Sequence, residues 1–176
     1  AKILDISPLV ALSTLLVESG GRPYYNFDGR DYPTIRIELH ILRDQHRKNN
    51  SPYANTIDTN FTGRDATRSY FDSQQNKWVK FGDVSGVDGQ RLNWRAFTEA
   101  ARYGYNEASA AISLGLPQVM GFNYATLGYS NPAEQFTFFT NDIRWQVLGY
   151  FDFIVNYRRE LLNAARNRDF GAFAGI

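Results

Sequence analysis

Apolar residues at helical spacing run through the start and the second half of this chain, and they restrict it to a mainly α-helical fold. Leu9, Leu12 and Leu16 recur every three or four residues, as one side of a helix requires. The same spacing recurs at Trp94, Phe97 and Ala101, and at Ile143, Val147, Tyr150, Ile154 and Leu161. We therefore expect a mainly α domain (α+β) with a small β element.

Turn-forming residues predict where these helices begin and end. Ser7 followed by Pro8 fits a helix start, with Ser as the N-cap and Pro in the first turn, and Gly20-Gly21 fits its end. Asn131-Pro132 predicts a second start, with Glu134 placed to act as the acid of a capping box. The last periodic stretch predicts one long helix from Ile143 to Leu161.

The segment between the helical regions is less regular. Ile35, Ile37 and Leu39 alternate with polar residues, which predicts a half-buried strand over residues 34–42, and a helix over residues 36–48 is the alternative. Residues 49–91 are rich in Asn, Ser, Thr, Asp and Gly. We interpret them as a divergent, loop-rich insertion with a hairpin turn near residues 74–76, within a single domain spanning residues 1–176.

Composition narrows the function. The chain has no cysteine, which excludes disulfides, thiolate metal sites and a cysteine nucleophile. A net charge of +1 gives no case for binding nucleic acid or a membrane surface. No apolar run approaches the ~20 residues of a membrane span, and no signal peptide is visible at the start. The spacing of His40 and His46 does not suggest a ligand pair, so we expect no metal. We also expect a monomer that needs no cofactor.

Glu18 is the first candidate for chemistry. It lies in the last turn of an otherwise apolar helix, where the negative end of the helix dipole and an apolar setting both disfavour an ionised carboxylate. Both effects raise a carboxyl pKa, as a general acid working near neutral pH requires. The alternative is an ordinary solvated glutamate at a helix end.

Residues 113–123 form the second candidate. The segment is apolar, interrupted by glycines, and carries the amides of Gln118 and Asn123. Amides donate and accept hydrogen bonds, which suits sugar hydroxyl and acetamido groups. The alternative is a connecting turn packed into the core.

Together the two segments resemble a known pattern. Glu18-Ser19-Gly20, followed much later by Ser113-x-Gly115-x-x-Gln118-Val119-Met120-Gly121, is similar to soluble lytic transglycosylases and goose-type lysozymes. The resemblance implies a lysozyme-like fold with a substrate cleft. In that superfamily, the glutamate ends a helix at the cleft and is the catalytic acid. The resemblance therefore implies this role for Glu18, and a place in the opposite wall of the cleft for residues 113–121.

A resemblance covering most of the chain is to the N-acetylmuramidase domain of phage endolysins. It rests on residues 17–21, 28–30, 33–41, 108–109, 115–123, 128–129 and 169–174. It implies hydrolysis of the bond between N-acetylmuramic acid and N-acetylglucosamine in the glycan strands of bacterial peptidoglycan, in the periplasm or outside the cell.

The predicted site follows from these motifs. We expect Glu18 and Glu38 to be catalytic, with Glu38 stabilising an oxocarbenium ion or orienting water. An ion pair of Glu38 with Arg36 or Arg43 is the alternative, and Asp28 and Asp31 are weaker candidates for the second role. The expected substrate-binding residues are Ser19, Gln118, Met120, Asn123 and Tyr124, and Trp78 and Tyr129 are further aromatic candidates for stacking on sugar rings.

Two other functions remain open. A lytic transglycosylase needs only one glutamate and gives 1,6-anhydro-muramyl products, which are lighter than the hydrolytic products by one water. A non-catalytic wall-binding module would keep the fold without the chemistry. Because Glu18 is intact, we rank this module last.

Overall fold

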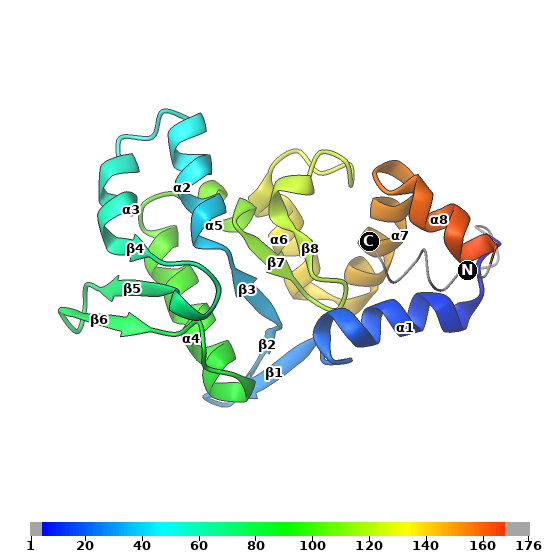
Figure 1. The fold of residues 1–176 in the computed structure, drawn as a ribbon, viewed down its shortest axis with the longest axis horizontal. Helices are drawn as coiled ribbons and strands as arrows, with labels where there is room; N and C mark the ends of the chain where they lie inside the picture. Colours follow the sequence, from blue (N-terminus) through cyan, green and yellow to red (C-terminus); the bar gives the residue numbers. More distant parts are fainter. Residues whose placement is uncertain (1–4, 168–176) are drawn as a thin grey trace.

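Three small antiparallel sheets are set among helices in the computed structural model, which describes residues 5–167 (Figure 1). The helices are α1 (Pro8–Ser19), α2 (Leu39–Lys48), α3 (Ala54–Asn60), α4 (Gly86–Ala101), α5 (Tyr105–Ala110), α6 (Pro132–Asn141), α7 (Ile143–Asn156) and α8 (Arg159–Arg166), with 3-10 turns η1 (Asp65–Thr67) and η2 (Gly121–Asn123). The strands are β1 (Tyr24–Phe27), β2 (Arg30–Pro33), β3 (Ile35–Ile37), β4 (Phe61–Thr62), β5 (Ser69–Asp72), β6 (Lys77–Lys80), β7 (Ile112–Leu114) and β8 (Val119–Met120). The mainly α fold is the predicted one. None of these helices is long and apolar enough to cross a membrane.

Helix α1 has the predicted limits. Pro8 occupies its first turn, and Gly20 ends it with a left-handed φ of 62°. Ser7 stands at the N-cap, as predicted, although its side chain makes no capping hydrogen bond. Ala11 and Leu15 are buried in a small core with Tyr150 and Leu162, which holds α1 against α7 and α8.

The predicted strand over residues 34–42 is too long. Strand β3 ends at Ile37, and α2 begins at Leu39, so the strand and its helical alternative each hold for part of the segment. The change follows burial, because Ile35 and Ile37 are buried at strand spacing, whereas Leu39 and Leu42 are buried at helical spacing.

Strand β3 belongs to the sheet at the centre of the molecule. It pairs with β7, which pairs with β8, and both pairs are antiparallel. Ile35, Ile37, Ile112 and Leu114 are buried in the main core together with Phe97 of α4. The sheet thus joins β3 to the glycine-containing segment at residues 113–123, which follows α5.

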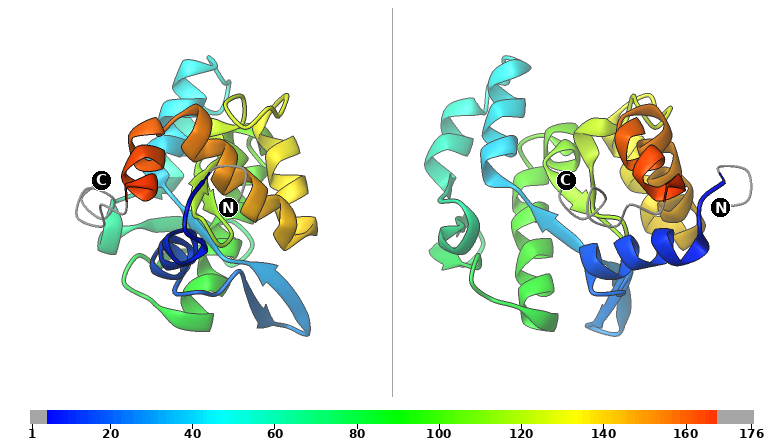
Figure 2. Two further views of the ribbon diagram at one scale, coloured as in Figure 1. Left: turned by 90° about the vertical axis from the view of Figure 1, so that its right-hand side faces the viewer. Right: turned by 45° about the vertical axis from the view of Figure 1, so that its right-hand side comes forward.

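The segment at residues 49–91 is more regular than the sequence suggested. It forms α3, the three-stranded sheet β4–β5–β6 and the start of α4, and its Ile57, Phe61, Tyr70 and Phe81 belong to the main core. The hairpin near residues 74–76 is confirmed as β5–β6. Figure 2 shows α3 and this sheet on the opposite side of α4 from α7 and α8.

The C-terminal helices depart from the prediction in one respect. Asn131 caps α6 by accepting the amide of Glu134, as expected, and Glu134 accepts the amide of Ser130 rather than that of Asn131. The predicted helix from Ile143 to Leu161 is broken into α7 and α8 after Asn156. The break lets Leu162 and Ala165 of α8 pack against α1. The matched residues 169–174 lie outside the described part of the chain.

Candidate active site

Glu18 lies in the last turn of α1. Its side chain is exposed, yet nearby protein atoms remove part of its hydration, and this burial raises the pKa of the carboxyl above its ordinary value. The hydroxyl of Ser19 donates to the Leu15 carbonyl within the helix at 3.0 Å. Glu18 is therefore an accessible carboxyl that holds its proton to higher pH than usual, and a substrate contact of Ser19 stays a prediction.

Thr34 connects the segment after Glu18 to the turn at residues 115–118, which lies between β7 and β8. Its amide donates to the Pro23 carbonyl at 2.9 Å, and its hydroxyl donates to the Arg22 carbonyl at 2.5 Å. Its own carbonyl accepts the Gly115 amide at 2.7 Å. Leu116, next in the turn, packs against the small core that contains Leu15 of α1. The two segments that the sequence singled out are thus neighbours in space.

Gln118 holds this turn closed. Its Nε2 donates to the Gly115 carbonyl at 2.7 Å and to the Thr34 carbonyl at 3.3 Å, and its Oε1 accepts the Ser113 hydroxyl at 2.8 Å. Its backbone has a φ of 50°, which is unusual for a residue with a side chain. The amide is already used within the protein, so Gln118 supports the turn, and its contact with substrate stays a prediction.

One face of the central sheet carries further predicted residues. Arg36, Ser113 and Met120 are paired across β3, β7 and β8, and residues paired in this way project to the same side of a sheet. Glu38 follows Arg36 by two residues and continues this alternation. Arg36 is exposed and Met120 is partly exposed, while Ser113 between them is buried, so this face is open at β3 and β8, whereas the opposite face is part of the core.

Glu38 forms the ion pair that the sequence analysis considered. Its Oε1 lies 2.6 Å from Nε of Arg36, and its Oε2 lies 3.8 Å from Nδ1 of His40. Arg43 instead donates to the Phe61 carbonyl. Four residues of extended chain, ~13 Å at ~3.3 Å each, separate Glu38 from Thr34. The turn at residues 115–118 contacts Thr34, just before β3, whereas Glu38 lies just after the other end of β3. The catalytic role of Glu38 stays a prediction.

The two aspartates of the β1–β2 hairpin are exposed and have partners. Asp28 pairs with Arg91 at 3.4 Å, and Asp31 accepts a hydrogen bond from the Asn26 amide at 2.8 Å. The hairpin begins shortly after α1, so both aspartates remain candidates for the second role.

The far end of β8 leads to a second group of predicted residues. Asn123 is buried, whereas Tyr124 lines a cavity of about 520 Å³. Its other walls include Phe122, which belongs to the segment at residues 113–123. They also include the amides of Gln45, Asn49, Asn106 and Asn131, which the sequence did not indicate as binding residues. These amides come from α2, the residue after it, α5 and the residue before α6, and no sequence spacing connects them. Aromatic rings beside amides suit an N-acetylated sugar.

The remaining aromatic candidates differ in setting. Trp78 is exposed on β6 beside Phe71, and Tyr129 packs against Phe138 and Phe139 at the main core. Tyr129 is therefore partly a packing residue. Trp78 belongs to the β4–β5–β6 sheet, on the other side of α4 from α7 and α8 (Figure 2).

Comparison with known proteins agrees with this arrangement. No protein of curated function matches the sequence. The structure is similar to the crystal structure of the Burkholderia AP3 phage endolysin, with a TM-score of 0.69 and 21% sequence identity, which shows a shared fold. The match covers 97% of this chain and 57% of the endolysin, so the chain spans little more than half of that protein. The N-acetylmuramidase family model matches residues 7–176. The chain therefore belongs to the N-acetylmuramidase family.

Proposed function

We propose that this chain hydrolyses the bond between N-acetylmuramic acid and N-acetylglucosamine in bacterial peptidoglycan, with Glu18 as the general acid. One observation carries the proposal: in a member of the N-acetylmuramidase family, Glu18 is an exposed carboxyl with a raised pKa. It ends a helix whose Leu15 shares a small core with Leu116, in the turn that Gln118 and Thr34 hold together. A carboxylic acid whose pKa is raised keeps its proton to higher pH and can donate it to a leaving oxygen.

The proposed reaction begins with proton transfer from Glu18 to the glycosidic oxygen. The bond between that oxygen and C1 of the muramic acid then breaks, and positive charge develops at C1. A water adds through its oxygen to C1 and gives its proton to a carboxylate. We assign that role to Glu38, which shares the open face of the central sheet with Met120.

Each carboxylate considered for the second role already has a partner in the structure, and this favours a second candidate function that needs Glu18 alone. Glu38 is paired with Arg36, Asp28 with Arg91, and Asp31 accepts from Asn26. If none of them acts on water, Glu18 alone can serve as acid and then as base, and the C6 hydroxyl of the muramic acid attacks C1. This is the lytic transglycosylase reaction, and its product is a 1,6-anhydro sugar.

The substrate of this proposal is the glycan strand. The cavity beside Tyr124 offers amides and an exposed aromatic ring, Phe122. We propose that this cavity and the open sheet face hold sugar units on either side of the cleaved bond. Peptidoglycan lies outside the cytoplasmic membrane, so we propose that the protein acts there, in the periplasm or from outside the cell. A monomer is sufficient for this chemistry.

Purified peptidoglycan tests the proposal. The protein should lower the turbidity of a peptidoglycan suspension, and mass spectrometry should find reducing muramic acid ends. Products that are lighter by one water would instead indicate the transglycosylase reaction. If the protein binds the wall but releases no soluble product, the chain is a non-catalytic wall-binding module.

A further inference from the structure

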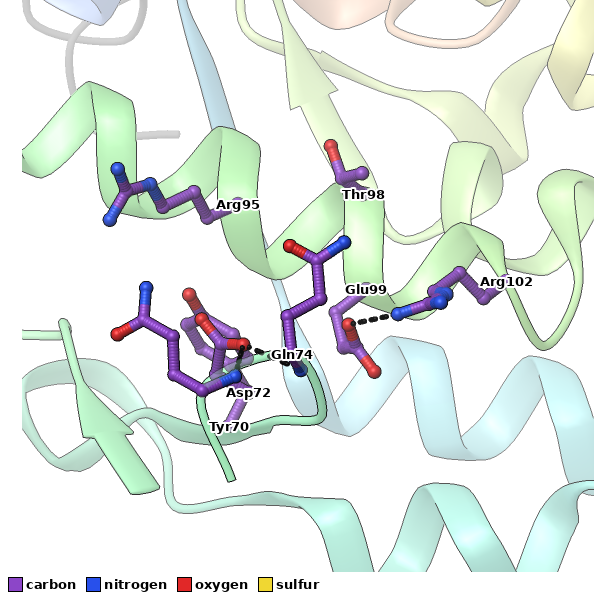
Figure 3. A pocket seen from close by; sticks show the side chains of 8 residues that line it. Tyr70, Asp72, Gln74, Arg95, Thr98, Glu99 and Arg102 are labelled. Carbon is purple, nitrogen blue, oxygen red and sulfur yellow. Dashed lines mark hydrogen bonds and ion pairs between the residues drawn. The ribbon is translucent and has the colours of Figure 1, made fainter. Parts of the chain in front are cut away.

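A second polar cavity, of about 340 Å³, lies between the β5–β6 turn and α4 (Figure 3). Asp72 and Gln74 line it from the hairpin, and Arg95, Glu99 and Arg102 line it from α4 and the residue that follows. None of these residues belongs to α1, the turn at residues 115–118 or the open face of the central sheet. No step of the proposed reaction uses this cavity.

Two nearly buried carboxylates form its negative side. Asp72 is 8% exposed and Glu99 is 6% exposed. Oδ1 of Asp72 accepts the amides of Gln74 and Gln75 at 3.0 and 2.9 Å, which fixes the turn, and no hydrogen bond to its Oδ2 is found in residues 5–167. Oδ2 is not among the fully buried polar atoms of the described residues that lack a partner, so it stays open to the cavity and can accept a donor there.

Two polar atoms at the base of the cavity also lack partners. Oε1 of Glu99 and the hydroxyl of Tyr70 are buried and form no hydrogen bond within the described residues. Burial and the neighbouring Asp72 raise the pKa of Tyr70 to about 12, so its hydroxyl keeps its proton and can donate. Buried groups of this kind are rare in folded proteins and call for an explanation, such as a bound ligand or water.

Arginines supply the positive side. Arg102 lies 3.2 Å from Oε2 of Glu99 and donates to the Ser73 hydroxyl at 2.7 Å. Arg95 is exposed and forms no hydrogen bond or ion pair with any residue in the range 5–167. Figure 3 shows the side chains of Arg95 and Asp72 on opposite sides of the cavity. A ligand there meets a carboxylate on one side and an unpaired guanidinium on the other.

We propose that this cavity binds the zwitterionic end of a peptidoglycan stem peptide, where one carbon carries an ammonium and a carboxylate. The ammonium supplies hydrogen-bond donors to Asp72 and Glu99, and the carboxylate binds the guanidinium of Arg95. The two acidic and two basic residues balance in charge, which favours a neutral zwitterion over a simple cation or anion. Such an end is present on an uncross-linked stem that finishes in a diamino acid. The identity of this ligand rests on the proposed function.

The test is a titration of the complete chain with the tripeptide L-alanyl-γ-D-glutamyl-meso-diaminopimelic acid, followed by NMR of the Gln74 and Gln75 backbone amides. The tripeptide should shift both signals, and the same tripeptide acetylated on its distal amino group should bind at least ~10-fold more weakly. Arg95→Met should also weaken binding at least ~10-fold, while Arg64→Met, an exposed arginine elsewhere, should not.

Arg95→Met is the main variant because an exposed, unpaired side chain is not needed for folding. Glu99→Gln, which keeps the shape but removes the charge, should give a similar loss. Equal binding of the acetylated peptide, equal binding by Arg95→Met, or no shift at millimolar peptide would overturn the proposal. The peptides contain no glycosidic bond, so these outcomes are independent of whether the protein cleaves glycan strands.

Discussion

Nε2 of Gln118 lies 3.3 Å from the carbonyl oxygen of Thr34, and this contact joins two segments separated by more than eighty positions in the sequence. Thr34 in turn binds Arg22 and Pro23, which follow Glu18 by a few residues. Gln118, which the sequence predicted to bind substrate, thus helps to hold the segment that follows Glu18.

Gln118→Glu should disturb this connection more than its small change in shape suggests. The new carboxylate still accepts from Ser113, but it faces the carbonyls of Thr34 and Gly115 without a donor. We expect a loss of about 1–3 kcal/mol in the free energy of unfolding. Thermal and urea unfolding would measure it. Gln118→Met, which removes the polar atoms without adding charge, is the control and should cost less.

Crowding at Gly115 gives a second prediction. Its φ is 72°, and a Cβ built there would lie 2.5 Å from Cδ of the buried Gln146. Gly115→Ala should therefore combine a left-handed backbone cost of about 1–2 kcal/mol with overpacking of about 1–3 kcal/mol.

Gly128→Ala is the matched control for Gly115→Ala. Its φ is 83°, but a Cβ there meets nothing within 4 Å. Chemical denaturation of both variants should find a larger loss at Gly115. Equal losses would mean that Gln146 moves aside and that the turn is less rigid than the structure indicates.

Glu38 and Arg36 provide a test of the second catalytic carboxylate. Glu38→Gln should lower cleavage at least ~10-fold if Glu38 accepts the proton of the attacking water. Arg36→Gln breaks the same 2.6 Å ion pair but leaves the carboxylate in place. Activity that falls only in Glu38→Gln, with similar melting temperatures for both variants, supports catalysis. Equal losses in the two variants would assign Glu38 a structural role.

The raised pKa of Glu18 predicts how stability depends on pH. Because the folded-state pKa lies above the unfolded-state value, the contribution of Glu18 to stability is fully present below the unfolded pKa and is lost as pH rises through the folded pKa. Glu18→Gln does not titrate at this position. Its melting temperature relative to the wild type should therefore rise between pH 3.5 and pH 7. A relative fall over this range would show that the carboxylate is favoured in the folded protein and would weaken the case for a general acid.

Local patterns were sufficient for some of these features and not for others. The limits of α1 follow from Pro8 and Gly20, because capping depends on neighbours in sequence. The end of β3 does not, because the apolar alternation continues past Ile37 and only packing of Leu42 against the core decides for a helix. The break after Asn156 likewise depends on contacts of α8 with α1.

The candidate site shows the same division. The motif identified Glu18 and the turn at residues 115–118, but it carried no information on where the Gln118 amide would bind. The amides beside Tyr124 come from three separate helices and the segments that flank them, and the cavity beside Asp72 lies in the segment expected to be loop-rich. Such groups are found only when the tertiary structure brings them together.

The most direct test of the account is the activity of Glu18→Gln on purified peptidoglycan, measured as the rate of release of reducing muramic acid ends. The substitution keeps the size of the side chain but removes its acidic proton. General acid catalysis contributes about 10²–10⁴-fold, so we expect a loss of at least that order with a cooperative unfolding transition retained. A rate within about tenfold of the wild type would show that Glu18 is not the acid.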